Sequence, residues 1–115
     1  MSDEFISLAT KEINEEISGI DVVLNSCSND NDIVLKSSEF ERHTHKIKGL
    51  APMMGKESLG ELSSYLDTIL KEIIDGKKFQ GVFELLNESL FEMKNVMDEP
   101  NYDLNPVLEK IKQFL

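Results

Sequence analysis

The chain has 115 residues, a hydrophobic fraction of 40% and a formal net charge of −10. Its length predicts one domain over residues 1–115, and its hydrophobic fraction is large enough for that domain to have its own core. A surface this acidic repels phosphate backbones, so we expect no nucleic acid partner. Its single cysteine, Cys27, excludes a disulfide framework and suits a reducing compartment. Without a long apolar run or a basic leader, we expect a cytoplasmic protein with no membrane insertion.

The apolar side chains recur every three to four residues along most of the chain, which is the spacing of amphipathic helices. A polar stretch over 26–32, the glycines Gly55 and Gly76, and Pro100 supply the breaks between them. Asn105 and Pro106 form a typical helix start. Helices are therefore expected over about residues 3–25, 33–54, 57–75, 79–98 and 105–115.

No segment alternates with the period of a strand, so the predicted fold class is all-α. Short links between long helices favour antiparallel neighbours. The expected architecture is an antiparallel up-down four-helix bundle with a short fifth C-terminal helix.

Motifs that would let the chain act as an enzyme by itself are missing from the sequence. It has no glycine-rich phosphate loop, no HExxH motif, no Cys/His ligand set and no serine or cysteine nucleophile motif. The two histidines, His43 and His45, are spaced so that they point to different sides of a helix, which argues against a metal site between them. We therefore expect no bound cofactor and no metal, and no self-sufficient enzyme.

Both histidines of the protein lie within residues 41–49. On a helical wheel with about 100° per residue, His43 lies about 60° from the centre of the apolar stripe and His45 about 140° from it. His43 is thus predicted as a structural residue at the edge of the core. His45 is predicted to face solvent, with Gly49 one turn further along the same face and Lys48 beside it.

An exposed imidazole in this setting suits a phosphoryl acceptor. Neutral imidazole is a good nucleophile near pH 7 because its reference pKa is about 6.5. Gly49 would give a partner protein steric access, and Lys48 would contact the phosphoryl group.

A hairpin that reverses near Gly55 brings His45 level with about Leu66, so Asp67 is the candidate partner for one ring nitrogen. Such a hydrogen bond would fix the tautomer and leave the other nitrogen free to attack. Ser63 and Ser64 lie on the same flank and are further candidates for polar contacts.

The run from His45 to Gly55, HKIKGLAPMMG, resembles the phosphoacceptor motif of histidine-containing phosphotransfer (HPt) domains. Segments 5–12, 59–62 and 66–70 extend the resemblance over most of the chain, and it is strongest to the P1 domain of CheA-type chemotaxis histidine kinases. The resemblance implies that His45 is phosphorylated, commonly at Nε2. It also implies a partner kinase domain that holds ATP and Mg, and a response-regulator receiver domain whose aspartate takes the phosphoryl group.

The sequence departs from that family at three positions. Lys46 stands where serine or threonine usually follows the phosphoacceptor, and Ser64 and Asp67 stand where the P1 domains often carry a second histidine and a glutamate. Pro52 is expected to bend the second helix just beyond Gly49.

Two forms of this phosphorelay function stay open: a free-standing HPt protein, and the P1 domain of a larger kinase. The alternative is a non-catalytic helical interaction module that kept the HPt fold without phosphotransfer.

Overall fold

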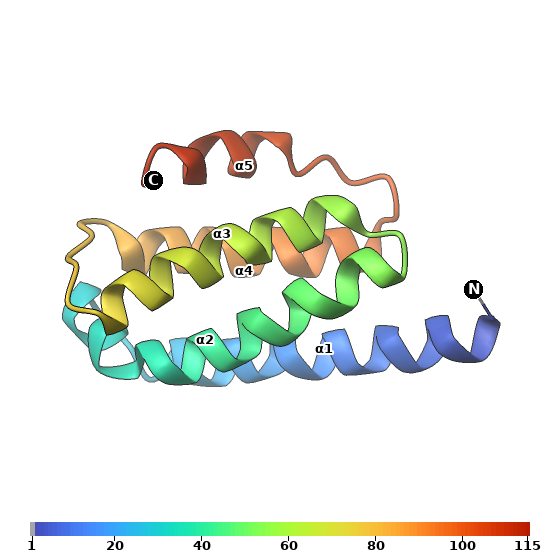
Figure 1. Cartoon of the computed structure of the whole chain (residues 1–115), viewed down its shortest axis with the longest axis horizontal. Coiled ribbons are helices and arrows are strands. Elements are labelled where there is room, and N and C mark those ends of the chain that lie inside the picture. The colour runs from blue at the N-terminus through green and yellow to red at the C-terminus, as the bar shows by residue number, and fades with distance from the viewer. Residues whose placement is uncertain (1) are drawn as a thin grey trace.

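The protein, a computed structural model that describes residues 2–115, contains five helices and no strand over that range. They are α1 (Asp3–Asn25), α2 (Asp30–Met53), α3 (Glu57–Ile74), α4 (Val82–Asp98) and α5 (Asn105–Lys112). The all-α prediction is confirmed. Helices α1 to α4 run along the long dimension of a body measuring 41 × 24 × 22 Å, and the chain reverses direction at each connection (Figure 1).

Helix α2 begins at Asp30 rather than at residue 33, because the polar stretch before it provides a cap. The side chain of Asn29 accepts a hydrogen bond of 2.9 Å from the backbone N–H of Asp32. A side-chain acceptor at this position satisfies a backbone donor that the first helical turn leaves free. Residues that resemble a loop in composition therefore extend the helix.

Helix α4 begins at Val82 rather than at residue 79, and α5 ends at Lys112 rather than at residue 115. Gly81 has a φ of +88°, a left-handed conformation that suits glycine and ends the preceding turn. The Asp30 carboxylate then accepts hydrogen bonds from the backbone N–H groups of Gly81 (2.9 Å) and Phe83 (2.8 Å). The start of α4 is thus capped by a residue of α2.

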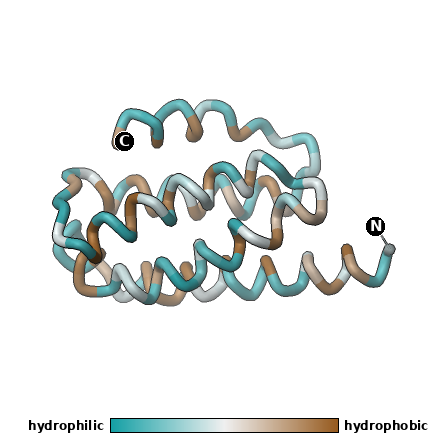
Figure 2. Tube along the Cα trace, in the orientation of Figure 1, coloured by the Kyte–Doolittle hydropathy of each residue, from teal (hydrophilic) through white to brown (hydrophobic). Residues whose placement is uncertain are grey.

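Helix α2 is the central element of the packing, with α3 as its main neighbour and further contacts to α1 and α4. Helix α5 packs on α3 and α4. Hydrophobic residues gather on the inward sides of the helices (Figure 2), and the largest fully buried side chains include Phe40, Ile13, Ile20, Ile33 and Ile47. Burial of these stripes supplies most of the stability of the fold.

Three residues of the expected apolar stripes lie outside the core. Leu8 of α1 has 58% of its surface exposed, Ile74 at the end of α3 has 46%, and Leu115 has 51%. The first turns of α1 project past the neighbouring helices (Figure 1), so no second helix covers them. Between residues 2 and 115, none of the helices is both long and apolar enough to cross a membrane.

Pro52 lies in the last turn of α2 and packs closely against Gly60 of α3. A methyl group at Gly60 would lie 2.7 Å from Cγ and 2.9 Å from Cδ of the Pro52 ring. The missing side chain of Gly60 therefore lets α3 approach α2 at the end of the hairpin.

We expect Gly60→Ala to lower the free energy of unfolding by about 1–2 kcal/mol. The rigid proline ring cannot move aside, and overpacking of this kind costs more than the helix propensity that alanine adds. Denaturant unfolding measures the change. Gly49→Ala is the matched control, because a methyl group at Gly49 meets no atom within 4 Å; equal stability changes in the two variants would contradict the packing argument.

Candidate functional site

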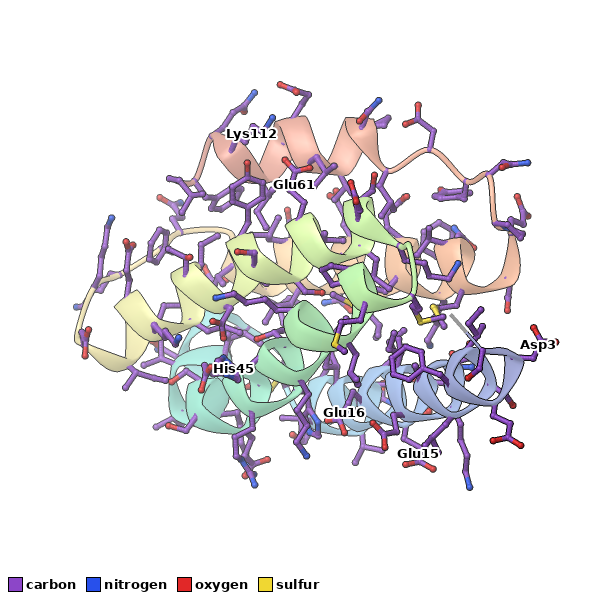
Figure 3. The ribbon with its side chains drawn as sticks, turned by 45° about the vertical axis from the view of Figure 1, so that its right-hand side comes forward. Asp3, Glu15, Glu16, His45, Glu61 and Lys112 are labelled. Atoms are coloured by element: carbon purple, nitrogen blue, oxygen red, sulfur yellow. The ribbon has the colours of Figure 1, made fainter. Side chains whose placement is uncertain are left out.

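His45 lies in the middle of α2 on its outer face. Its neighbours Thr44 and Ile47 are fully buried, and this sets the rotation of the helix so that the His45 side chain points outward with 60% of its surface exposed. Figure 3 shows His45 on α2, and Glu15 and Glu16 on the neighbouring α1. The ring is accessible to another protein, as the spacing of the sequence predicts.

Asp67 of α3 lies behind the ring with only 1% of its surface exposed. Its Oδ2 atom is 3.5 Å from Nδ1 of His45 and 3.5 Å from Nζ of Lys48. Lys71, one turn later on α3, brings its Nζ to 3.1 Å from the same oxygen, and the Thr44 hydroxyl donates to Oδ1 at 3.5 Å. The expected neighbourhood of His45 and Asp67 is present, and it includes Lys71, which the sequence analysis did not single out.

Glu41 is a second acidic partner of the ring that the sequence analysis missed. It lies one turn before His45 on α2, and its Oε2 atom is 3.6 Å from Nδ1 of His45. Among the described residues, no donor makes a hydrogen bond to this buried oxygen. The spacing of four residues between Glu41 and His45 is the signal that sequence reasoning had available.

The two carboxylates have opposite pKa shifts. Burial by itself raises the pKa of Asp67, but hydrogen bonds from Glu41 and Lys71, the positive charge of Lys71 and a hydrogen bond from His45 outweigh it and hold that pKa below its usual value. For Glu41, the hydrogen bond to Asp67, burial and the negative charge of Asp67 raise the pKa. The site therefore favours an ionised Asp67 beside a Glu41 that takes up a proton more readily than an exposed glutamate does.

The remaining predicted site residues lie as follows. Lys48 is half-exposed and paired with Asp67, and Gly49 is exposed with open space around it.

Ser63 is fully buried and its hydroxyl makes no hydrogen bond to any described residue. Ser64 accepts a hydrogen bond from Thr68 at its backbone carbonyl, and no hydrogen bond joins it to His45 within residues 2–115. The two serines are therefore not brought to the ring.

His43 has a different environment from His45, although only one residue separates them. Its Nδ1 atom lies 2.7 Å from Oε1 of Glu16 on α1. The ring fills the space above Gly19, where an added methyl group would lie 2.3 Å from Cε1 of His43. His43 thus joins α1 to α2, in the structural place expected for it.

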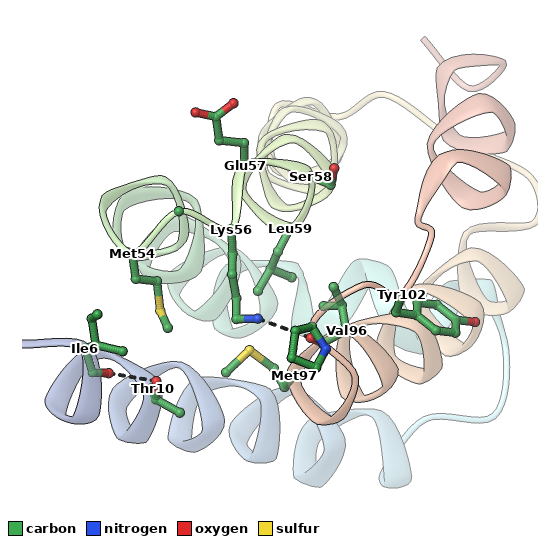
Figure 4. Close-up of a pocket in the computed structure, with 12 residues that line it drawn as sticks. Ile6, Thr10, Met54, Lys56, Glu57, Ser58, Leu59, Val96, Met97 and Tyr102 are labelled. Carbon is green, nitrogen blue, oxygen red and sulfur yellow. Dashed lines mark hydrogen bonds between the residues drawn. The ribbon is translucent and has the colours of Figure 1, made fainter. Parts of the chain in front are cut away.

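One surface pocket adjoins His45, between α1 and α2. It is lined by His45, Lys46 and Gly49 of α2 and by Glu12, Glu15 and Glu16 of α1. A second pocket of about 510 Å³ lies between the start of α1, the α2–α3 turn and the end of α4, where Lys56 Nζ donates to the carbonyl oxygen of Val96 at 3.3 Å (Figure 4). This second pocket contains none of the predicted site residues.

We expect Glu41→Gln to be more stable than the unmodified protein at pH 7. The pKa of Glu41 is raised in the folded state above its unfolded value of about 4.5. The stability that the protonated group contributes is fully present below pH 4.5 and is lost as pH rises through the folded pKa. Glutamine stays neutral at every pH, so it avoids this loss. The expected rise in Tm is about 2–4 °C, which corresponds to roughly 0.5 kcal/mol for a solvent-screened charge.

Thermal unfolding from pH 3 to pH 8 checks this prediction. The gain in Tm is expected to vanish near pH 3, where Glu41 is protonated. The exposed Glu12→Gln serves as control, and a gain in Tm that is the same at every pH would contradict the assignment.

Comparison with known proteins does not assign a function to this site. No protein-family model matches the sequence, and neither a curated protein nor a solved structure does. A function for the chain is therefore argued from the arrangement of Glu41, His45, Lys48, Asp67 and Lys71.

Proposed function

We propose that the chain is a histidine-containing phosphotransfer module of two-component signalling, of the chemotaxis type, built as an antiparallel up-down four-helix bundle with α5 on its side. The observation that carries the proposal is the solvent-exposed imidazole of His45 with the buried carboxylate of Asp67 at its Nδ1 atom. The resemblance of the sequence around His45 to HPt domains supports the same conclusion.

In the proposed first step, Nε2 of His45 attacks the γ-phosphorus of ATP held by a kinase domain. A nitrogen–phosphorus bond forms, the bond from phosphorus to the bridging oxygen breaks, and ADP leaves. The proton stays on Nδ1, where the Asp67 carboxylate stabilises the positive charge that develops on the ring. Asp67 acts here as a positioning residue that keeps the Nε2 lone pair free.

In the second step, an aspartate of a receiver domain attacks the phosphorus and the bond to Nε2 breaks, which restores neutral His45. Lys48 Nζ lies at 3.5 Å from Asp67 and is 40% exposed, so it can turn towards a phosphoryl group on the ring. Lys71 then remains to balance the charge of Asp67.

Gly49 gives independent support for a partner at this face. Glycine in a helix interior costs about 1 kcal/mol relative to alanine, and beyond its chain neighbours and the local backbone of α2 no described atom lies within 4 Å of a methyl group built there. Internal packing thus gives no reason for glycine at this exposed position, whereas close approach of a second protein does.

In this proposal ATP and Mg²⁺ are bound by the kinase domain, in the cytoplasm, and this chain supplies the nucleophile and the docking surface. The alternative is an interaction module without phosphotransfer. The presence of Ser64 where the P1 domains often have a second histidine favours that alternative, and the labelling experiment below decides between the two.

We expect His45→Gln to abolish phosphorylation of the chain, because glutamine cannot act as the nitrogen nucleophile. The measurement is incorporation of label from γ-labelled ATP in the presence of candidate histidine kinases. The label should be lost in acid and kept in alkali, as expected for a nitrogen–phosphorus bond.

His43→Gln is the matched control and should retain the label, since His43 is paired with Glu16 of α1. Circular dichroism of both variants tests folding. Label that persists in His45→Gln and is lost in His43→Gln would move the site, and absence of label with every kinase tried would favour the interaction module.

We expect Gly49→Ala to separate stability from transfer. The variant should gain up to about 1 kcal/mol of unfolding free energy and lose phosphotransfer at least several-fold, because the methyl group occupies the surface that a partner approaches. Denaturant unfolding and the initial rate of label incorporation give the two values. Unchanged transfer in a stabilised variant would show that no partner approaches Gly49 closely.

A further inference from the structure

We propose that Glu41, His45 and Asp67 form a binding site for a zinc-type divalent cation, and that the bound metal blocks phosphorylation of His45. The ligand atoms are Oε2 of Glu41, Nδ1 of His45 and Oδ2 of Asp67, which all lie within 4.8 Å of one another. Metal binding itself does not depend on the proposed function; the effect on phosphorylation rests on it.

The two distances from Nδ1 of His45 to the carboxylate oxygens fit tetrahedral coordination. In a site with metal–ligand distances of about 2.0–2.2 Å, the ligand atoms lie about 3.3–3.6 Å from one another. Nδ1 of His45 is 3.5 Å from the Asp67 oxygen and 3.6 Å from the Glu41 oxygen. Three protein ligands leave a fourth position, and the exposure of His45 leaves it open to water.

The buried Oε2 atom of Glu41 is a second observation that favours a cation at this point. It has no hydrogen-bond donor among the described residues and is 3.6 Å from Nδ1 of His45. When Glu41 is ionised and has no proton to share with Asp67, this buried acceptor lacks a donor, which is costly, and a metal ion would satisfy it. Because carboxylate and imidazole ligands must be deprotonated to bind a metal, affinity is expected to fall in acid.

Lys48 and Lys71 oppose metal binding, since both ammonium groups lie near Oδ2 of Asp67, at 3.5 and 3.1 Å. Their side chains are 40% and 52% exposed, so each can turn into solvent when a cation enters. The favoured metal is thus one that binds imidazole strongly, such as Zn²⁺. The hard cation Mg²⁺ prefers oxygen ligands and keeps its water.

Metal binding and phosphorylation exclude each other because neutral imidazole has one free lone pair on nitrogen. When the lone pair of Nδ1 coordinates a metal, the ring proton is on Nε2, and Nε2 cannot attack phosphorus. When the proton is on Nδ1 beside Asp67, Nε2 is free and Nδ1 cannot coordinate. A metal would therefore hold His45 in the unreactive tautomer.

Isothermal titration of the whole chain with Zn²⁺ alone, without ATP or kinase, tests the binding. We expect one ion per chain, with affinity lowered on the order of 100-fold in His45→Gln and about tenfold in Glu41→Gln and Asp67→Asn. Lys71→Gln should raise the affinity about threefold because it removes a competing cation. Lys77→Gln is its matched control, since Lys77 pairs with Glu72 instead.

His43→Gln and Cys27→Ser should bind zinc as the unmodified chain does. Absence of binding, or an affinity that His45→Gln or Glu41→Gln leaves unchanged in folded protein, overturns the proposal. Loss of binding in Cys27→Ser or His43→Gln moves the metal elsewhere and overturns it as well. Glu41→Gln keeps the test decisive if Asp67→Asn does not fold.

A labelling assay then tests the block on phosphorylation. Zinc at a concentration that saturates the unmodified chain should suppress its label incorporation. The same concentration should suppress labelling of Glu41→Gln much less. Autophosphorylation of the kinase, measured with and without zinc, shows any effect of zinc on the kinase itself. Label that is unaffected by bound zinc overturns the mutual exclusion. A chain that binds zinc and is never labelled would contradict the proposed function and leave the metal site standing.

Discussion

The buried carboxylate of Asp67 is the constraint on which the arrangement of the site depends. An ionised group with 1% of its surface exposed is stable only when charges and donors surround it. Here Lys71, Lys48, His45 and the Thr44 hydroxyl converge on its two oxygens. Because these partners come from both α2 and α3, satisfying one carboxylate fixes how the two helices lie against each other and how the His45 ring is oriented.

The contact between α2 and α3 makes this convergence possible. Pro52 sits against Gly60 near the hairpin turn, and the absence of a side chain at Gly60 lets the helix axes come close. The two histidines flank the core residue Thr44 in the sequence, and they therefore point to different sides of α2 and have different surroundings. His43 is held by Glu16 above Gly19, while His45 has no helix in front of it and remains open to solvent.

The chemistry available at His45 follows from which of its ring nitrogens carries the proton. Asp67 and Glu41 both face Nδ1, so a proton there is stabilised and Nε2 is left as the nucleophile. The same two carboxylates make Nδ1 a good metal ligand once its proton is gone. One imidazole can therefore support phosphoryl transfer or cation binding, and its tautomer separates the two.

The sequence by itself determined the features that depend on local periodicity. The spacing of apolar residues gave five helices, and the phase of the second one put Thr44 and Ile47 inside and His45 outside. The absence of nucleotide-binding motifs and the pairing of His45 with Asp67 were also accessible, the latter because a short hairpin sets which residues lie level.

Only the tertiary structure decided what depends on how helices are rotated and shifted against each other. Capping of α4 by Asp30 joins residues far apart in sequence, and no local pattern encodes it. The depth at which Asp67 is buried, the role of Lys71 and the unpartnered oxygen of Glu41 have the same origin. Leu8, although part of an apolar stripe, stays exposed because burial requires a second surface, and none lies over the first turns of α1.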